Sequence, residues 1–179
     1  MISVKQQGYR EFQLGPYLLG SSITVYVGDA VAFSDSPSTA GTLTNATAKV
    51  AGTAYAVGVV TKIVDKDGNP LLASDGTELK SITTGASNTT YYAMIVPAMK
   101  GFLMEFDVNA TLGTTTGSNQ PGGYFNLADA RTVAENSYVA SGATGSPKQV
   151  YSLGPSVDPI TGAVSTNKII GFFTKSVQA

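Results

Sequence analysis

The segment from Gly101 to Val108 limits the possible folds of this chain more than any other part of its sequence. Four apolar side chains fall on one side of a two-residue period in it: Phe102, Met104, Phe106 and Val108. Successive side chains of a strand point to opposite faces, so this period predicts a strand with one buried and one polar face. Similar short signals recur between clusters of turn-forming residues, and no long stretch has the 3.6-residue period of an amphipathic helix. We therefore expect an all-β chain.

The other strand signals begin at Ile23. We expect strands at 23–27, 30–33, 54–64, 91–96 and 168–174, and an antiparallel pair between 91–96 and 101–108. The segment 54–64 has apolar residues on both faces around Gly58, which predicts burial on both sides and either a bend or a close backbone approach at the glycine. A short helix is expected within 127–138.

The predicted organisation is an N-terminal arm, residues 1–22, followed by a β domain, residues 23–179. The arm has neither the two-residue period of a strand nor the 3.6-residue period of a helix. We expect it either to cover one end of the core or to dock on a neighbouring subunit. The β domain is expected to be an antiparallel β-barrel or sandwich with long polar loops, of which 111–123 is the longest. Loops of this length are usually functional or mobile.

A weak internal repeat suggests that the β domain contains two similar lobes, about 23–110 and 111–179. At an offset of 94, four residues of the first part match four of the second: Gly28, Val31, Phe33 and Asp35 with Gly122, Phe125, Leu127 and Asp129. At an offset of 113, the segment 58–62 resembles 171–175. Unrelated strands share glycine and β-branched residues easily, so chance similarity is the competing explanation.

The composition favours contact with other proteins over chemistry or nucleic-acid binding. Only 13% of the residues are charged, so 21 threonines and 17 serines must supply much of the polar surface. An ordinary β domain with Ser/Thr-rich loops would have the same composition. The net charge is −1 and the basic residues are scattered, which makes no stripe for binding phosphates.

The residue types argue against an enzyme and against a metal or cofactor site. The chain has no histidine and no cysteine, so the commonest general base, zinc ligands and thiol nucleophile are missing. Phosphate-binding glycine motifs and a Ser nucleophile elbow are also absent. No run approaches the ~18 apolar residues of a membrane helix, and the first eight residues lack the apolar core of a signal peptide. We expect no cofactor, no membrane association and synthesis in the cytoplasm.

Two acidic patterns have a functional and a structural interpretation. The segment 65–69 resembles part of a calcium-binding loop, but its glycine stands fourth instead of sixth, so a hairpin turn is the better interpretation. Glu105 and Asp107 share the polar face of one predicted strand. Without a second group of reactive residues they are better explained as a solvated face, or as partners for Lys or Arg, than as a catalytic pair.

Three segments resemble the capsid decoration proteins, or cement proteins, of tailed bacteriophages: Tyr26 to Phe33 with its Gly-Asp-x-Val turn, Tyr55 to Val60, and the strand from Gly101 to Val108. The resemblance implies a small, non-enzymatic β domain, typically a homotrimer, in the virion. It would sit on the outer capsid surface and reinforce the contacts between major capsid protein subunits.

On this resemblance, the arm and the long polar loop are the candidate contact regions. The candidate interface residues are Tyr9, Phe12, Tyr17, Leu18, Thr115, Asn119 and Gln120. The alternatives are a tail, fibre or other surface-assembly subunit, and a carbohydrate-binding module that uses Tyr91, Tyr92 or Tyr124. A hydrolase is the least favoured alternative.

Overall fold

The computed structural model describes residues 2–4, 13–34, 40–45, 56–99, 102–140 and 149–174. These residues form strands and turns and contain no helix, which confirms the all-β prediction. The strands are β1 (Ile2–Val4), β2 (Leu14–Leu18), β3 (Thr24–Tyr26), β4 (Ala30–Phe33), β5 (Leu43–Asn45), β6 (Gly58–Val64), β7 (Ser81–Thr83), β8 (Tyr92–Pro97), β9 (Met104–Val108), β10 (Gly123–Leu127), β11 (Thr132–Ala140), β12 (Val150–Val157) and β13 (Val164–Phe173).

The strands from the N-terminal half form one ring of pairings, which we call the N-terminal lobe. Strands β2, β8, β6, β4 and β5 pair in that order, each antiparallel to the next. A parallel bridge between Leu19 and Leu43 joins β5 to the chain leaving β2, so the ring closes. A separate ribbon of β3 and β7 pairs Thr24 with Thr83.

The strands from the C-terminal half form a second ring, the C-terminal lobe. Its order is β9, β11, β10, β12 and β13, and the pairing of β13 with β9 closes it. Only the β9–β11 pairing of this ring is parallel. Strand β1 pairs antiparallel with β9 beside β11, so Ile2 belongs to this lobe and is buried in its core.

The two rings have the same topology. In chain order, the five ring strands are β2, β4, β5, β6 and β8 in the N-terminal lobe and β9 to β13 in the C-terminal lobe. In both rings the first strand lies beside the third and runs parallel to it. The third strand then pairs with the second, the second with the fourth, the fourth with the fifth, and the fifth with the first. Strands β4 and β10 hold the same place, as the sequence match at offset 94 suggests. The match at offset 113 aligns β6, the fourth strand of its ring, with β13, the fifth strand of the other ring.

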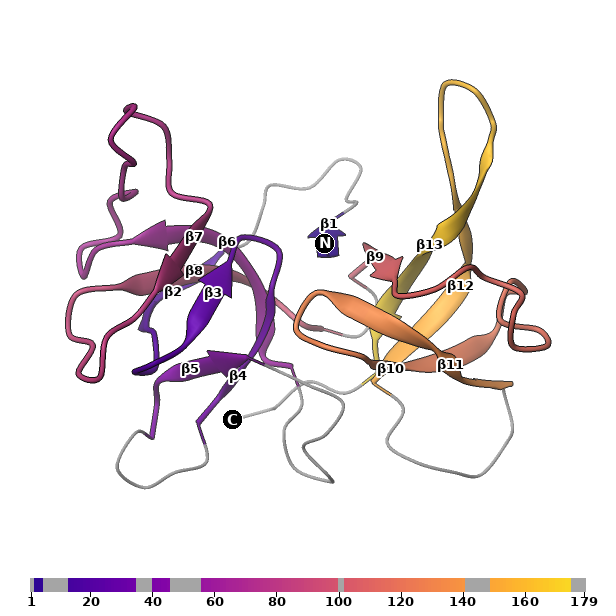
Figure 1. Cartoon of the computed structure of the whole chain (residues 1–179), viewed down its shortest axis with the longest axis horizontal. Helices are drawn as coiled ribbons and strands as arrows, with labels where there is room; N and C mark the ends of the chain where they lie inside the picture. Colours follow the sequence, from indigo (N-terminus) through magenta and orange to yellow (C-terminus); the bar gives the residue numbers. More distant parts are fainter. Residues whose placement is uncertain are drawn as a thin grey trace.

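The lobes pack closely against each other, and Figure 1 shows them side by side. Along β4, Val31 points into the core of the N-terminal lobe, whereas Ala30 and Ala32 pack in a cluster with large side chains of the C-terminal lobe. In β6, Val60 packs in the core of the N-terminal lobe, whereas Val59 packs in the cluster shared with the C-terminal lobe. The predicted burial on both faces of this strand is therefore confirmed. Small side chains on the outer face of one ring thus let the second ring approach it closely.

The chain crosses from one lobe to the other between β8 and β9. The prediction that 91–96 and 101–108 pair with each other is wrong, because β8 pairs with β2 and β6, whereas β9 pairs with β1, β11 and β13. Strands β2 to β8 thus belong to the N-terminal lobe and strands β9 to β13 to the C-terminal lobe, so the boundary between the lobes lies near residue 100 instead of the predicted 110. Strand β2 falls within the predicted arm, yet it is a member of the N-terminal ring.

The helix predicted within 127–138 is also wrong, because this segment is a hairpin between β10 and β11. The Asp129 carboxylate accepts hydrogen bonds from the backbone N–H groups of Arg131 and Thr132, both at 2.7 Å. The Ala128 N–H donates to the Thr132 carbonyl at 2.8 Å and closes the turn. Asp side chains commonly stabilise turns in this way, and here the local bonds take precedence over a helix.

At Gly171 the second ring leaves no room for a side chain, because the nearest atom belongs to the backbone of the paired strand. A Cβ added there would lie 2.2 Å from the carbonyl oxygen of Tyr151 in the paired strand, so the backbones would have to separate. We expect Gly171→Ala to lower the free energy of unfolding by about 2–3 kcal/mol in urea titrations. Gly85→Ala is the matched control, because a Cβ there meets nothing within 4 Å. Equal stability of the two variants would contradict the close approach of β12 and β13.

Candidate functional site

The predicted contact residues of the long polar loop lie in a segment fixed by one buried carboxylate. Glu135, on β11, is 2% exposed and accepts hydrogen bonds from the loop. The donors are the Thr115 N–H at 2.6 Å, the Thr115 hydroxyl at 2.8 Å and the Ser118 hydroxyl at 2.5 Å. The Ser118 oxygen in turn accepts the Gly113 N–H at 2.7 Å. The loop is therefore a defined surface built around Glu135.

The electrostatics of Glu135 agree with this arrangement. Burial by itself raises the pKa of a carboxyl group, but the hydrogen bonds from Ser118 and Thr115 outweigh it and hold the pKa of Glu135 below its ordinary value. Sequence reasoning missed this residue. The available signal is that Glu135 follows Val133 at a two-residue spacing and therefore falls on the buried face of its strand.

The loop presents only some of the predicted residues to solvent. Asn119 and Gln120 are exposed, and the Gln120 amide approaches the Asn119 side-chain oxygen at 3.4 Å. Thr115 is half-buried, and both its backbone and its side chain bind Glu135. Asn119 and Gln120 are thus available for contacts with a partner, whereas Thr115 shapes the loop.

The remaining predicted contact residues do not join this loop. Tyr17 and Leu18 lie on β2 in the other lobe and are half-buried. The ring of Tyr17 packs edge-on against Phe33, with centroids 5.4 Å apart. The Tyr17 side chain packs against the core of the N-terminal lobe, which is one of the two roles predicted for the arm. Tyr9 and Phe12 lie outside the described residues.

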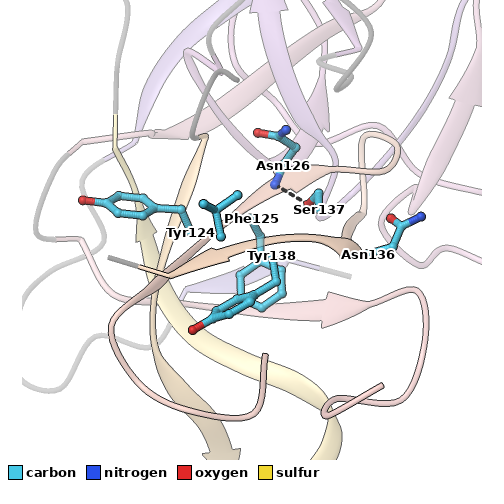
Figure 2. A pocket seen from close by; sticks show the side chains of 7 residues that line it. Tyr124, Phe125, Asn126, Asn136, Ser137 and Tyr138 are labelled. Carbon is cyan, nitrogen blue, oxygen red and sulfur yellow. Dashed lines mark hydrogen bonds between the residues drawn. The ribbon is translucent and has the colours of Figure 1, made fainter. Parts of the chain in front are cut away.

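A cavity of about 250 Å³ lies against the hairpin of β10 and β11 (Figure 2). The pairing of these strands shifts register between Tyr124 and Asn126, and Asn126 N–H donates instead to the Ser137 hydroxyl at 2.8 Å. Figure 2 shows the side chains of Tyr124 and Asn136 pointing away from each other. In a specific small-molecule site the polar groups converge on one point. The polar groups around this cavity do not.

An aromatic row crosses the outer face of the C-terminal lobe. Tyr124 on β10 pairs with Tyr151 on β12, which pairs with Phe172 on β13. Their ring centroids are 4.9 Å and 5.3 Å apart in turn, and all three side chains are half-buried. Phe173 points inward and is 1% exposed, so β13 places Phe173 in the core and Phe172 on the outer face.

An ion pair between the buried carboxylate of Asp29 and the partly exposed guanidinium of Arg131 joins the two lobes. The Asp29 carboxylate, which follows Gly28 in the Gly-Asp turn, accepts the Tyr26 N–H at 3.0 Å and the Arg131 Nε–H at 2.7 Å. The Arg131 guanidinium carbon lies 3.4 Å from the centre of the Tyr26 ring. The adjacent Ala30 N–H donates to the Ala130 carbonyl at 2.6 Å. Burial raises the pKa of Asp29, and the hydrogen bonds from Tyr26 and Arg131 oppose that shift.

Removing the Asp29 carboxylate is expected to weaken the junction of the lobes. Asp29→Ala leaves the Tyr26 N–H without its acceptor and removes the counter-ion of the partly exposed Arg131, at an expected cost of about 1–3 kcal/mol. Urea unfolding of this variant measures the loss. Lys66→Ala removes the fully exposed ion pair with Asp67 and should leave the urea midpoint almost unchanged. Similar losses in both variants would show that Asp29 does not join the lobes.

The acidic pair on β9 faces a lysine. Lys168 Nζ lies 3.2 Å from Glu105 Oε1 and 3.7 Å from Asp107 Oδ1, and the Ser156 hydroxyl donates to Glu105 Oε2 at 2.6 Å. Glu105 raises the pKa of Lys168. Glu105, Ser156 and Lys168 line one side of a hollow of about 600 Å³ along the β12–β13 hairpin. The contact with Lys168 agrees with the interpretation of Glu105 and Asp107 as ion-pair partners.

The other acidic pattern is a turn. The Asp65 carboxylate accepts the N–H groups of Asp67 and Asn69, each at 2.9 Å, and this local bonding lowers the pKa of Asp65, the Asn69 hydrogen bonds contributing most. Within the described ranges, no three His, Cys, Asp or Glu side chains are grouped so that they could hold a metal ion. No helix with the length and apolar character of a membrane span occurs in the same part of the chain.

The fold and these sites define an all-β chain of two joined lobes with the same topology and a polar loop held by the buried Glu135 carboxylate. No protein-family model matches the chain, and comparisons with curated proteins and with solved structures find no match.

Proposed function

We propose that this protein is a non-enzymatic virion component, a capsid decoration protein that acts as a homotrimer on the outside of an assembled phage head. It would bind neighbouring major capsid protein subunits and hold them together. The observation that carries the proposal is the pair of lobes of one topology, joined by the Asp29–Arg131 ion pair. A chain built this way offers two separated contact regions at a fixed distance, which suits a partner with regularly repeated subunits.

The mechanism is physical. A protein that touches several coat subunits at once raises the free energy needed to remove any one of them, because several contacts must break together. Each contact can be modest on its own. The rigid loop around Glu135 supports this role, since Asn119 and Gln120 are held in place before binding and lose little conformational entropy on contact.

The surface chemistry also supports lasting protein contact. Only 13% of the residues are charged, so few charges have to be desolvated when a large face is covered. A tail, fibre or other surface-assembly subunit would have similar chemistry, but it would assemble into rings or filaments on its own.

Light scattering after size-exclusion chromatography, over a dilution series, tests the proposed oligomer. We expect a mass three times that of the chain that persists on dilution. A monomer at all concentrations would contradict the trimer, and rings or filaments would point to the assembly subunit.

Carbohydrate binding is the second candidate, and the aromatic row of Tyr124, Tyr151 and Phe172 favours it. Half-buried aromatic rings on an outer sheet face can stack against sugars. This function requires saturable binding of an oligosaccharide by a monomer, which Tyr124→Ala should weaken at least tenfold in a calorimetric titration. Absence of binding across a panel of bacterial surface glycans would leave decoration as the better account.

A further inference from the structure

The aromatic row of the C-terminal lobe has a counterpart in the N-terminal lobe. Strands β4, β6 and β8 hold the same places in the first ring as β10, β12 and β13 hold in the second. Across the first three strands, the register pairs Ala30 with Val59 and Val59 with Val96. We call these three residues the aliphatic row. The same two steps across β10, β12 and β13 lead through the three residues of the aromatic row.

The sequence match at offset 94 aligns the two rows independently of the strand register. It equates Val31 with Phe125, and each of these side chains lies in the core of its own lobe. The preceding residues, Ala30 and Tyr124, are therefore equivalent, and both point to the outer faces of their rings. Topology, register and sequence thus agree that the two rows occupy the same place in their lobes.

The two rows differ in what covers them. The residues of the aliphatic row are at most 1% exposed, and they belong to the cluster that contains Phe106 and Phe173 of the C-terminal lobe. The residues of the aromatic row are much larger and remain partly exposed. The chain therefore buries this face in its first lobe and leaves the equivalent face of its second lobe in contact with solvent.

The surroundings of the aromatic row are uncharged. The same faces of β10, β12 and β13 continue with Asn126, Leu153 and Ile170, of which Leu153 is 46% exposed. The first charged side chain along these faces is Lys168, which lies 3.2 Å from Glu105. A sheet face in contact with water usually carries polar side chains, whereas the centres of protein interfaces are poor in charge and rich in aromatic residues. This face is therefore suited to being covered by protein.

The covered face of the N-terminal lobe indicates what covers the aromatic row. The aliphatic row is buried by a lobe of the same topology, which also contributes the Ala130 carbonyl and the Arg131 guanidinium to the junction. In every copy of the chain, the C-terminal lobe already covers its own N-terminal lobe. The lobe of this topology that is left to cover the aromatic row is the N-terminal lobe of a second copy.

We infer that the aromatic row is the contact surface between copies of this chain, with the C-terminal lobe of one copy packed against the N-terminal lobe of the next. This inference rests on the proposed function, because it assigns the surface that builds the proposed homotrimer. A contact between two different surfaces can repeat around a closed ring, and three copies then place six lobes in that ring. Large aromatic side chains suit a contact that forms after each chain has folded, because a few of them supply most of the binding energy.

Light scattering after size-exclusion chromatography compares the mass of the parent with that of three variants. Tyr151→Lys places a charge at the centre of the row, while the aliphatic stem of the lysine still covers the sheet. We expect it to raise the dissociation constant at least about thirtyfold, as loss of a central interface residue does, and to have the mass of one chain. Tyr151→Phe keeps the ring and should have the mass of three chains. Tyr92→Lys is the matched control, because Tyr92 is half-buried on β8 outside both rows, and it should also have the mass of three chains. Circular dichroism melting verifies that the variants are folded.

A cysteine probe tests the same face without changing the row. The chain has no cysteine, so Leu153→Cys and Leu72→Cys each carry a single thiol. Leu153 lies beside the row, and Leu72 is 60% exposed in the other lobe. In the native oligomer, the thiol of Leu153→Cys should react with a maleimide at least about tenfold more slowly than that of Leu72→Cys, and in urea the two rates should be equal. Equal rates in the native oligomer would overturn the inference, even if Tyr151→Lys fails to fold.

The mass of the parent and of Tyr151→Lys separates the inference from the proposed trimer. A parent of three chains and a folded Tyr151→Lys of one chain would support the inference. A folded Tyr151→Lys of three chains would overturn it and leave the trimer standing. A parent of two chains would mean that two equivalent surfaces meet each other, which would overturn the contact between unlike lobes.

A parent that is a monomer at all concentrations would overturn both the inference and the trimer. Co-sedimentation of this parent with bare heads of the virus that encodes the chain then decides whether a decoration protein remains the better account. Saturable oligosaccharide binding by such a monomer, lost in Tyr151→Lys, would assign the aromatic row to sugars and would likewise overturn the inference.

Discussion

Replacing Phe106 by Asp is expected to abolish folding. Phe106 is fully buried on β9, and its ring packs edge-on against Phe173 with centroids 5.3 Å apart. Loss of a buried phenylalanine typically costs about 3–5 kcal/mol, and an unpaired carboxylate in its place adds a further desolvation penalty. The total is comparable to the ~5–15 kcal/mol that stabilises a typical domain. The expected result is insoluble protein, or soluble protein without a cooperative thermal transition.

The neighbouring residue supplies the control. Asp107 lies on the opposite face of β9, where it is 3.7 Å from the partly exposed Lys168. We expect Asp107→Ser to cost less than about 1 kcal/mol, because such ion pairs contribute little. A cooperative transition at the parent temperature in Phe106→Asp would show that the faces of β9 are assigned incorrectly.

Glu135→Ala is expected to have the second-largest effect, a loss of about 3 kcal/mol in the free energy of unfolding. The substitution leaves the Thr115 N–H and the Ser118 hydroxyl without their buried acceptor. The loop should then lose its fixed shape, and its amides should exchange with solvent faster in hydrogen-exchange experiments. Glu78→Ala is the control, because Glu78 is exposed and paired only loosely with Lys62 at 3.6 Å.

The contribution of Glu135 should depend on pH with a definite sign. The pKa of Glu135 in the folded protein lies below its ordinary value of 4.5, so the charged form is favoured by folding. Its contribution to stability is therefore complete above that ordinary value and is lost as the pH falls through the folded pKa. The stability difference between the parent and Glu135→Gln should shrink in acid. A difference that stays constant from pH 7 to pH 3 would contradict the carboxylate's role.

Local patterns in the sequence were sufficient for the strand class and several turns. Alternation in β9 predicts which side chains are buried, since Met104 and Phe106 are in the core while Glu105 and Asp107 face Lys168. The apolar residues on both faces of β6 predict burial on two sides, because this strand separates the core of its own lobe from the second lobe. Each of these predictions needs only neighbouring residues.

Long-range pairings could not be predicted in the same way. Arg131 is 102 residues from Asp29, and neither residue has a neighbour in sequence that indicates the other. The Leu19–Leu43 bridge that closes the first ring depends on tertiary packing of ordinary leucines. The partners of Glu135 lie in a loop whose threonines and serines resemble those of many solvated loops. Strand partners are likewise set by ring closure, which is why β8 and β9 do not pair.

We propose that this protein reinforces an assembled head. Scanning calorimetry of bare heads, with and without a saturating amount of the protein, tests it most directly. We predict that the protein raises the temperature at which the shell disrupts and that free coat subunits melt unchanged. An unchanged disruption temperature at saturation would contradict capsid reinforcement.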